Sequence, residues 1–191
     1  PLCLDSTKPD VLETALKLYQ GKALINSVNG EEASMKNILP LAKRYGAAVV
    51  ALTLDENGIP AKAEGRLEIA KRIVAACEQY GIKRQDIYID SLVLTVGTDI
   101  NGPKETLRTM ALIREYLPGV NLLLGVSNVS HGLPNRPKLN SAFLAMAIGK
   151  GLDLSIINPL DEMMKNAWQS AALLTGRDEN AENYLQLNSE Q

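Results

Sequence analysis

The sequence predicts an α/β fold, a (β/α)8 barrel of the TIM type in which six of the eight βα units lie within these 191 residues. Six apolar runs alternate with segments of helical periodicity. The runs show little polar alternation, which is typical of strands buried on both faces of a parallel sheet. Several runs end in an acid or amide residue, and parallel α/β folds bind their ligands at the carboxyl ends of strands.

The first two units lie at the amino-terminal end of the chain. An apolar run at residues 2–6 predicts a strand, and Pro9 fits the first turn of a helix at 9–19 whose apolar residues share one face. A second strand is expected at 22–29. The acidic start of the next segment predicts a helix at 31–45, because negative side chains stabilise the amino-terminal end of a helix.

The third and fourth units follow the same plan. A run of small apolar residues at 47–54 predicts a strand, and a long periodic segment at 63–80 predicts a helix that Gly81 ends. The fourth strand ends at Asp90, and a helix is expected at 104–116.

The last two units begin with the run at 121–126, which predicts the fifth strand because aliphatic residues are bounded there by Gly and Ser. Beyond it we expect, in order, a long polar loop at 127–139, a helix at 140–149, a strand at 152–158, a helix at 161–175 and a short terminal helix at 178–187.

Six parallel strands with right-handed crossovers can form either an open doubly wound sheet or part of a barrel. Polar residues at nearly every strand end favour the barrel, because a ring of strands directs them toward one point. A closed barrel of this type needs eight units. We therefore expect residues 1–191 to form one barrel domain that lacks its first two βα units, which would precede Pro1.

The composition excludes several classes of partner. A formal net charge of −2 gives no basic field for a polyphosphate backbone, so no nucleic acid is expected. The chain is 46% hydrophobic and 22% charged, as in globular proteins, and no apolar run reaches the roughly 18 residues of a membrane span. The sequence therefore predicts no membrane segment.

The cysteines and the histidine bear on location and on metals. Cys3 and Cys77 lie in apolar segments, which suits buried thiols in a reducing cytoplasm better than a disulfide framework. A cytoplasmic location is expected. His131 is the single histidine, and neither a CxxC nor an HExxH spacing occurs, so no metal site is expected.

Four residues repeat one position, the carboxyl end of an apolar strand: Asp5, Asn26, Asp90 and Asn128. Each alone has an ordinary explanation, because Asp and Asn side chains often cap helices or close turns by accepting backbone N–H groups. Four of them on neighbouring strands favour a binding site, since their strand ends meet at one edge of the sheet.

The same residues carry a resemblance to a known family. The segments concerned are Leu4-Asp5-Ser6-Thr7, Ile25-Asn26-Ser27-Val28-Asn29, Tyr88-Ile89-Asp90, Gly125-Val126-Ser127-Asn128-Val129-Ser130, Asn135-Arg136-Pro137 and Ala142-Phe143-Leu144-Ala145-Met146-Ala147. Together, and over nearly the whole chain, they resemble the pterin-binding barrels. Within these they are most similar to the methyltetrahydrofolate:corrinoid methyltransferases and to the folate domain of cobalamin-dependent methionine synthase.

The resemblance implies a role for each strand-end residue. Asp5, Asn26 and Asp90 would bind the pyrimidine edge of the pterin, and Asn128 would reach N5 of the folate as the catalytic residue. The chemistry of the residues agrees, because an aminopyrimidinone offers N–H donors that carboxylates accept, while Asn both donates and accepts. A donor aimed at N5 would stabilise the species that forms as the methyl group leaves.

Three further residues are candidate substrate-binding residues: Arg136, His131 and Asn158. A guanidinium at Arg136 could stack on the pterin or pair with a carboxylate. His131 stands where the family often has Gln near the folate, although a lone loop histidine is more commonly a solvated residue. Asn158, at the end of the last strand, would lie at the mouth of the pocket.

The implied reaction is transfer of a methyl group between N5 of methyltetrahydrofolate and the cobalt of a corrinoid such as cobalamin. The corrinoid would come from a partner protein, because the chain lacks the Asp-x-His-x-x-Gly motif of corrinoid carriers. A homodimer is expected. One alternative is a dihydropteroate synthase, although Ile157-Asn158-Pro159 stands where that family has Arg-x-His. The other is a non-catalytic pterin-binding or assembly module, whose two exposed sheet edges would be covered by a partner.

Overall fold

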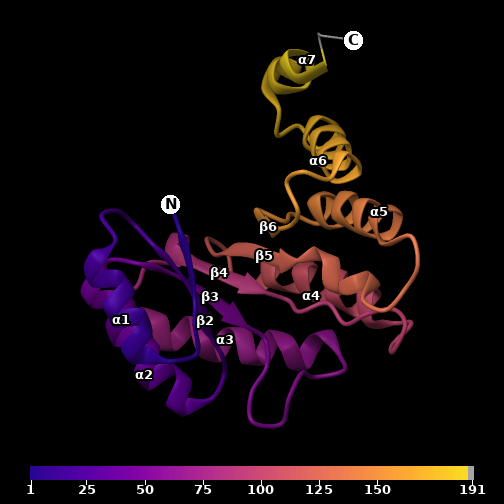
Figure 1. Cartoon of the computed structure of the whole chain (residues 1–191). Helices are drawn as coiled ribbons and strands as arrows, with labels where there is room; N and C mark the ends of the chain where they lie inside the picture. The colour runs from indigo at the N-terminus through magenta and orange to yellow at the C-terminus, as the bar shows by residue number, and fades with distance from the viewer. Residues whose placement is uncertain (189–191) are drawn as a thin grey trace.

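The computed structural model describes residues 1–188, which form a curved parallel sheet flanked by helices (Figure 1). The strands are β1 (Cys3–Asp5), β2 (Leu24–Val28), β3 (Ala48–Leu52), β4 (Ile87–Asp90), β5 (Asn121–Gly125) and β6 (Leu154–Ile156). The α-helices are α1 (Pro9–Leu18), α2 (Glu32–Tyr45), α3 (Ala63–Gln79), α4 (Gly102–Tyr116), α5 (Arg136–Gly149), α6 (Glu162–Leu174) and α7 (Glu182–Asn188). Short 3-10 turns are η1 (Arg84–Asp86), η2 (Val126–Ser130) and η3 (Glu179–Ala181).

The sheet has the strand order of a barrel. Its six strands run β1-β2-β3-β4-β5-β6, and every neighbouring pair is parallel. A parallel strand order that follows the chain order requires each connection to cross over on the same side, so the helices gather on one face and the sheet curls away from them. The predicted barrel-type α/β fold with six βα units is confirmed.

The main core lies between the sheet and its helices. Alternation along each strand sends one set of side chains to that core and the other set to the opposite face. Ile25 and Ile89 are fully buried against the helices, whereas Asp5 and Asn26 lie on the other face and reach solvent. These two predicted binding residues therefore lie on the face of the sheet that the helices do not cover.

The two edge strands differ from the prediction. Uniform burial on both faces was expected, but Cys3 in β1 is exposed, and Leu154 and Ile156 in β6 are exposed as well. In the described residues each of these strands has a neighbour on one side only. A side chain at such an edge lacks the cover that a second neighbouring strand supplies, so the prediction of a buried Cys3 thiol was wrong.

The segment after β5 also differs. A loop over 127–139 was expected, but η2 continues directly from the strand and α5 begins at Arg136 rather than near 140. Pro137 explains the early start, because proline lacks an N–H and therefore fits the first turn of a helix. The expected strand at 152–158 is shorter and consists of β6 alone.

The carboxyl-terminal helices extend from the sheet. Figure 1 shows α6 and α7 following one another beyond α5, at the yellow end of the chain. Trp168 and Met163 on α6 are both substantially exposed. Among residues 1–188, no helix combines the length and the apolar character needed to cross a bilayer.

Candidate functional site

Asp5 and Asn26 form the first part of the candidate site. Parallel pairing of β1 and β2 places the two residues at the same register, and the side-chain amide of Asn26 donates to Oδ2 of Asp5 over 3.1 Å. Neither side chain caps a helix or closes a turn in the described structure, so the ordinary explanation for Asx residues does not apply to this pair. A carboxylate and an amide are thus fixed side by side on the open face.

Asp90 ends β4 in a more buried setting, with 8% of its surface exposed. Its Oδ1 accepts the N–H of Leu92 over 2.8 Å, and its carboxylate also accepts the N–H of Gly125 in the next strand. Asp90 therefore closes a local turn, as the ordinary explanation holds, and in addition binds the backbone of β5.

Burial controls the charge of Asp90. Removal of the carboxylate from water raises its pKa to about 6, although the N–H groups of Leu92 and Gly125 and the positive charge of Arg66 oppose that rise. The group is consequently ionised at neutral pH, but it changes charge within about one pH unit of it. An ionised acceptor suits the N–H donors of an aminopyrimidinone.

Asn128 lies in η2, immediately after β5, and its side chain is exposed. No hydrogen bond to its carboxamide occurs among the described residues, so both its donor and its acceptor are available to a ligand. The amide nitrogen lies against Gly125, since a Cβ built on that glycine would stand 3.2 Å from it. The N–H of Gly125 is therefore directed at the carboxylate of Asp90, and the amide nitrogen of Asn128 lies beside the Cα of Gly125.

Arg136, at the start of α5, folds back on the turn that carries Asn128. Its Nη2 donates to the carbonyl of Ser127 over 2.8 Å, and its Nε donates to the hydroxyl of Ser130 over 3.1 Å. The Ser130 hydroxyl in turn donates to the buried Asn140 over 2.7 Å. The guanidinium was expected to stack on the pterin or to pair with a carboxylate, and in this structure it holds the backbone of η2.

The two remaining candidates are exposed. His131 follows η2, and its backbone carbonyl accepts the hydroxyl of Thr95 over 2.7 Å. Asn158 follows β6 and accepts the N–H of Leu160 over 3.1 Å. Asn158 therefore closes a turn before α6.

The four residues predicted to bind the ligand lie in two pairs. Asp5 bonds Asn26, and Asp90 and Asn128 meet at Gly125. Asp5 and Asp90 are the last residues of β1 and β4. Asn26 is the third residue of β2 and Asn128 lies in η2 beyond β5, so that β3 stands between the two pairs. No direct contact links one pair to the other in the described residues, and their joint role in a site stays a prediction.

A cavity whose lining includes neither Asp5 nor Asn26 contains residues that the sequence reasoning missed. Its volume is about 360 Å³, and it lies where β1, β2 and β3 end and α1 and α2 begin. The lining includes Thr7, Ser27, Asn29, Ser34 and Leu52. The run of small polar residues directly after Asn26 was the available signal, because such side chains leave space and offer hydrogen bonds at a strand end.

The site consists of carboxylates, amides and one guanidinium. Among residues 1–188, no group of three or more His, Cys, Asp or Glu side chains is placed to hold a metal ion. Chemically, such groups can hold a flat heterocycle by its rim, since carboxylates accept from ring N–H and amino groups and amides both donate and accept.

A comparison with known families gives this geometry its context. Residues 1–158 match the family described as pterin binding enzyme. The chain belongs to the pterin-binding enzyme family. This membership confirms the family inferred from the strand-end motifs.

Two related proteins are named for folate and methyl-group chemistry. The chain is 31% identical over 180 residues to a methylcorrinoid:tetrahydrofolate methyltransferase of Eubacterium limosum, covering 93% of this chain and 66% of that protein. It is 36% identical over 170 residues to a methionine synthase of Mycobacterium tuberculosis, covering 83% of this chain and 14% of that protein. The chain therefore spans about two thirds of the first relative and a small part of the second.

Solved structures show the same fold at lower identity. A dihydropteroate synthase of Clostridium difficile, solved in the presence of pteroic acid, superposes with a TM-score of 0.66 at 21% identity, covering 94% of this chain and 67% of that one. A dihydropteroate synthase of Coxiella burnetii gives a TM-score of 0.66 at 15% identity, covering 92% of this chain and 67% of that one. At this level of identity the likeness shows a shared fold and nothing about the reaction.

Proposed function

We propose that this pterin-binding enzyme is a methyltransferase that moves a methyl group between N5 of methyltetrahydrofolate and the cobalt of a corrinoid. The single observation that carries the proposal is the arrangement of Asp5, Asn26, Asp90 and Asn128 at the carboxyl ends of one sheet. The names of the relatives from Eubacterium limosum and Mycobacterium tuberculosis support the same chemistry.

The first three residues would hold the pterin. Asp5 and Asp90 provide carboxylate oxygens for the ring N–H and amino donors, and Asn26 adds an amide that donates and accepts. Charge-assisted hydrogen bonds of this kind fix the plane of the ring as well as binding it. Orientation matters here, because the methyl group on N5 must face the incoming or departing cobalt.

Asn128 would act on N5 itself. A tertiary amine is a poor leaving group, so a hydrogen-bond donor at N5 stabilises the charge distribution that develops as the carbon–nitrogen bond breaks. The exposed carboxamide of Asn128 has no partner among the described residues and is a neutral donor whose function needs no pKa adjustment. His131 and Asn158 would line the approach to the site, and Arg136 would hold the η2 turn or contact the folate.

The corrinoid would be carried by a separate protein in the cytoplasm. We also infer that two further βα units close the barrel between β6 and β1, because both strands have an unpaired side in the described structure. A homodimer is part of the proposal, and Trp168 and Met163 on α6 offer apolar surface for one. Light scattering of the complete protein tests the homodimer.

The experiment has two parts. Isothermal titration should show that methyltetrahydrofolate binds the complete protein, and absorbance should follow methyl transfer to free cobalamin. Asn128→Ala should keep binding within a few-fold and slow transfer about 100-fold, as loss of a transition-state donor does. Asn166→Ala, an exposed amide on α6, is the matched control and should behave as the parent. Absence of binding by the parent would falsify the proposal.

A dihydropteroate synthase and a non-catalytic pterin-binding module are the competing functions. The solved dihydropteroate synthases share the fold with this chain at 15–21% identity. An assay for dihydropteroate formation with the complete protein separates the first competitor. Binding of methyltetrahydrofolate with no methyl transfer to any corrinoid would favour the second.

A further inference from the structure

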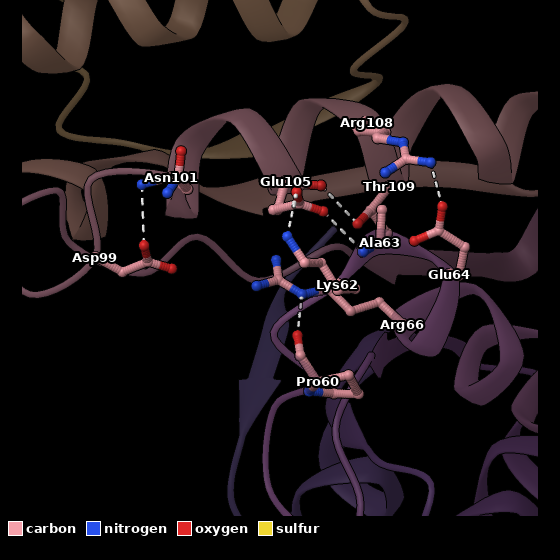
Figure 2. Close-up of polar contacts among 10 residues, drawn as sticks. All are labelled: Pro60, Lys62, Ala63, Glu64, Arg66, Asp99, Asn101, Glu105, Arg108 and Thr109. Carbon is pink, nitrogen blue, oxygen red and sulfur yellow. Dashed lines mark hydrogen bonds and ion pairs between the residues drawn. The ribbon is translucent and has the colours of Figure 1, made fainter.

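Arg66 on α3 is a fully buried arginine whose guanidinium binds backbone carbonyls rather than a carboxylate. Its Nε donates to the carbonyl of Pro60 over 2.8 Å, as Figure 2 shows. Its Nη1 donates to the carbonyls of Ser91 over 2.9 Å and Leu92 over 2.7 Å. Arg66 thus ties the loop after β3 to the loop that follows Asp90, the last residue of β4.

Leu92 links Arg66 to Asp90. The carbonyl of Leu92 accepts Nη1 of Arg66 and the hydroxyl of Thr106, the latter over 3.0 Å, while its N–H donates to Oδ1 of Asp90. Leu92 also has a φ of 52°, a left-handed conformation that an L-residue other than glycine rarely adopts. Such a conformation persists where surrounding contacts fix it, and the two bonds to its carbonyl do so.

The helices on either side are fixed by an exchange of side chains. Arg66 on α3 reaches Thr106 on α4, with Nη1 3.3 Å from the hydroxyl. In return, Glu105 on α4 accepts the N–H of Ala63 over 3.0 Å, the first residue of α3 (Figure 2). This bond satisfies one of the free N–H groups at the start of α3 and fixes the first turns of that helix, from which Arg66 extends.

Three acidic side chains oppose the effect of burial on the charge of the Arg66 guanidinium. The carboxylates of Glu105, Asp99 and Asp90 attract the guanidinium of Arg66. Of these residues, Asp90 is proposed to bind the pterin. The attraction from Arg66 lowers the pKa of Asp90 against the opposing effect of burial. The Nη2 of Arg66 is buried and has no hydrogen-bond partner among residues 1–188. The positive charge of Arg66 is therefore buried although one of its N–H groups makes no hydrogen bond, which is unfavourable for folding.

We propose that Arg66 is a positioning residue for pterin recognition: by holding the carbonyl of Leu92, it fixes the turn whose N–H orients the carboxylate of Asp90. The role rests on the proposed function, because the value of an oriented Asp90 is the binding of the pterin. It also explains why a long charged side chain is buried between α3 and α4, where an apolar residue would fill the same space without orphaning a donor.

The test compares two variants with a matched control. Arg66→Gln removes the charge and the bonds to Leu92, whereas Thr106→Val keeps the charge and removes one bond to that carbonyl. Arg114→Gln is the control, because Arg114 binds the carbonyl of Val120 over 3.0 Å, outside the candidate site. The readouts are the NMR titration of the Asp90 carboxyl carbon, assigned with Asp90→Asn, and calorimetric binding of tetrahydrofolate to the complete protein.

We expect Arg66→Gln to raise the pKa of Asp90 by about one unit and to weaken tetrahydrofolate binding at pH 7 about tenfold. Thr106→Val should weaken binding about threefold with little change in the titration, because the guanidinium charge remains. Arg114→Gln should change neither readout, although it should lower the melting temperature.

Several outcomes overturn the inference. If Arg66→Gln has the same Asp90 pKa and the same affinity for tetrahydrofolate as Arg114→Gln, the role of Arg66 is structural alone. If Arg66→Gln does not fold, Thr106→Val decides, and parental binding by that variant overturns the inference. If the parent binds no tetrahydrofolate, the proposed function fails, while an unchanged Asp90 titration in Arg66→Gln would separately remove the link between Arg66 and Asp90.

Discussion

The side-chain amide of Asn26 donates to the carboxylate of Asp5 over 3.1 Å, across two neighbouring parallel strands. The bond uses one oxygen of Asp5 and leaves the other without a hydrogen-bond partner among residues 1–188. The carbonyl oxygen of the Asn26 side chain is likewise without a partner there. The pair is therefore held in a fixed orientation and can still bind a ligand.

Replacement of Asp5 by Asn should weaken folate binding and leave the fold intact. The variant keeps the shape of the side chain and removes the charge, so a charge-assisted hydrogen bond to the pterin loses about 1.5–2 kcal/mol, or about 10- to 30-fold in Kd. Isothermal titration with methyltetrahydrofolate measures the change. Asp10→Asn, an exposed carboxylate in the first turn of α1, is the matched control, and equal affinities for the two variants would contradict a ligand role for Asp5.

Asp90 should make the stability of the protein depend on pH. Its pKa is about 6 in the folded state, against 3.8 for the free side chain, so between these values the folded protein binds more protons than the unfolded chain. The contribution of Asp90 to the free energy of unfolding should therefore fall by about 2 kcal/mol as the pH rises from 4 to 6. Denaturant unfolding at several pH values, in the parent and in Asp90→Asn, measures it. The same pH dependence in both proteins would contradict the prediction.

Gly125→Ala should disturb catalysis more than stability. The new Cβ would stand 3.2 Å from the amide nitrogen of Asn128, so the exposed carboxamide must move by a few tenths of an ångström. The φ of Gly125 is −79°, which alanine adopts without strain. We expect methyl transfer to slow about tenfold, because small displacements of a catalytic group are costly, with a melting temperature close to that of the parent. A rate equal to that of the parent would show that the position of Asn128 is not critical.

Ser91→Ala should stabilise the protein. The hydroxyl of Ser91 is buried and has no hydrogen-bond partner in the described part of the chain, and burial of such a group costs about 1 kcal/mol or more. Removing it should raise the free energy of unfolding by about 1 kcal/mol. Ser141→Ala serves as control, because the hydroxyl of Ser141 donates to the carbonyl of Lys138 over 3.1 Å. Its removal should leave the free energy of unfolding unchanged or slightly lower. A destabilised Ser91→Ala would indicate that the hydroxyl has a partner after all.

The sequence by itself determined the order of the elements and the strand ends on which the site is built. Apolar runs, helical periodicity and the Gly and Pro residues between them are local signals, and they predicted all six strands and the helices that follow them. The same local signals located Asp5, Asn26, Asp90 and Asn128 at strand ends. The resemblance of these segments to pterin-binding barrels predicted the family.

Only the tertiary structure decided how these residues are held. The bond between Asp5 and Asn26 joins residues 21 positions apart, and the support of Leu92 by Arg66 joins residues 26 positions apart. The burial that raises the pKa of Asp90 likewise comes from the packing of distant segments. The exposure of Cys3 was decided in the same way, because it depends on which strands stand beside β1. Side-chain patterns along the chain carry no information on such distant neighbours, since burial and hydrogen bonding arise from packing between elements.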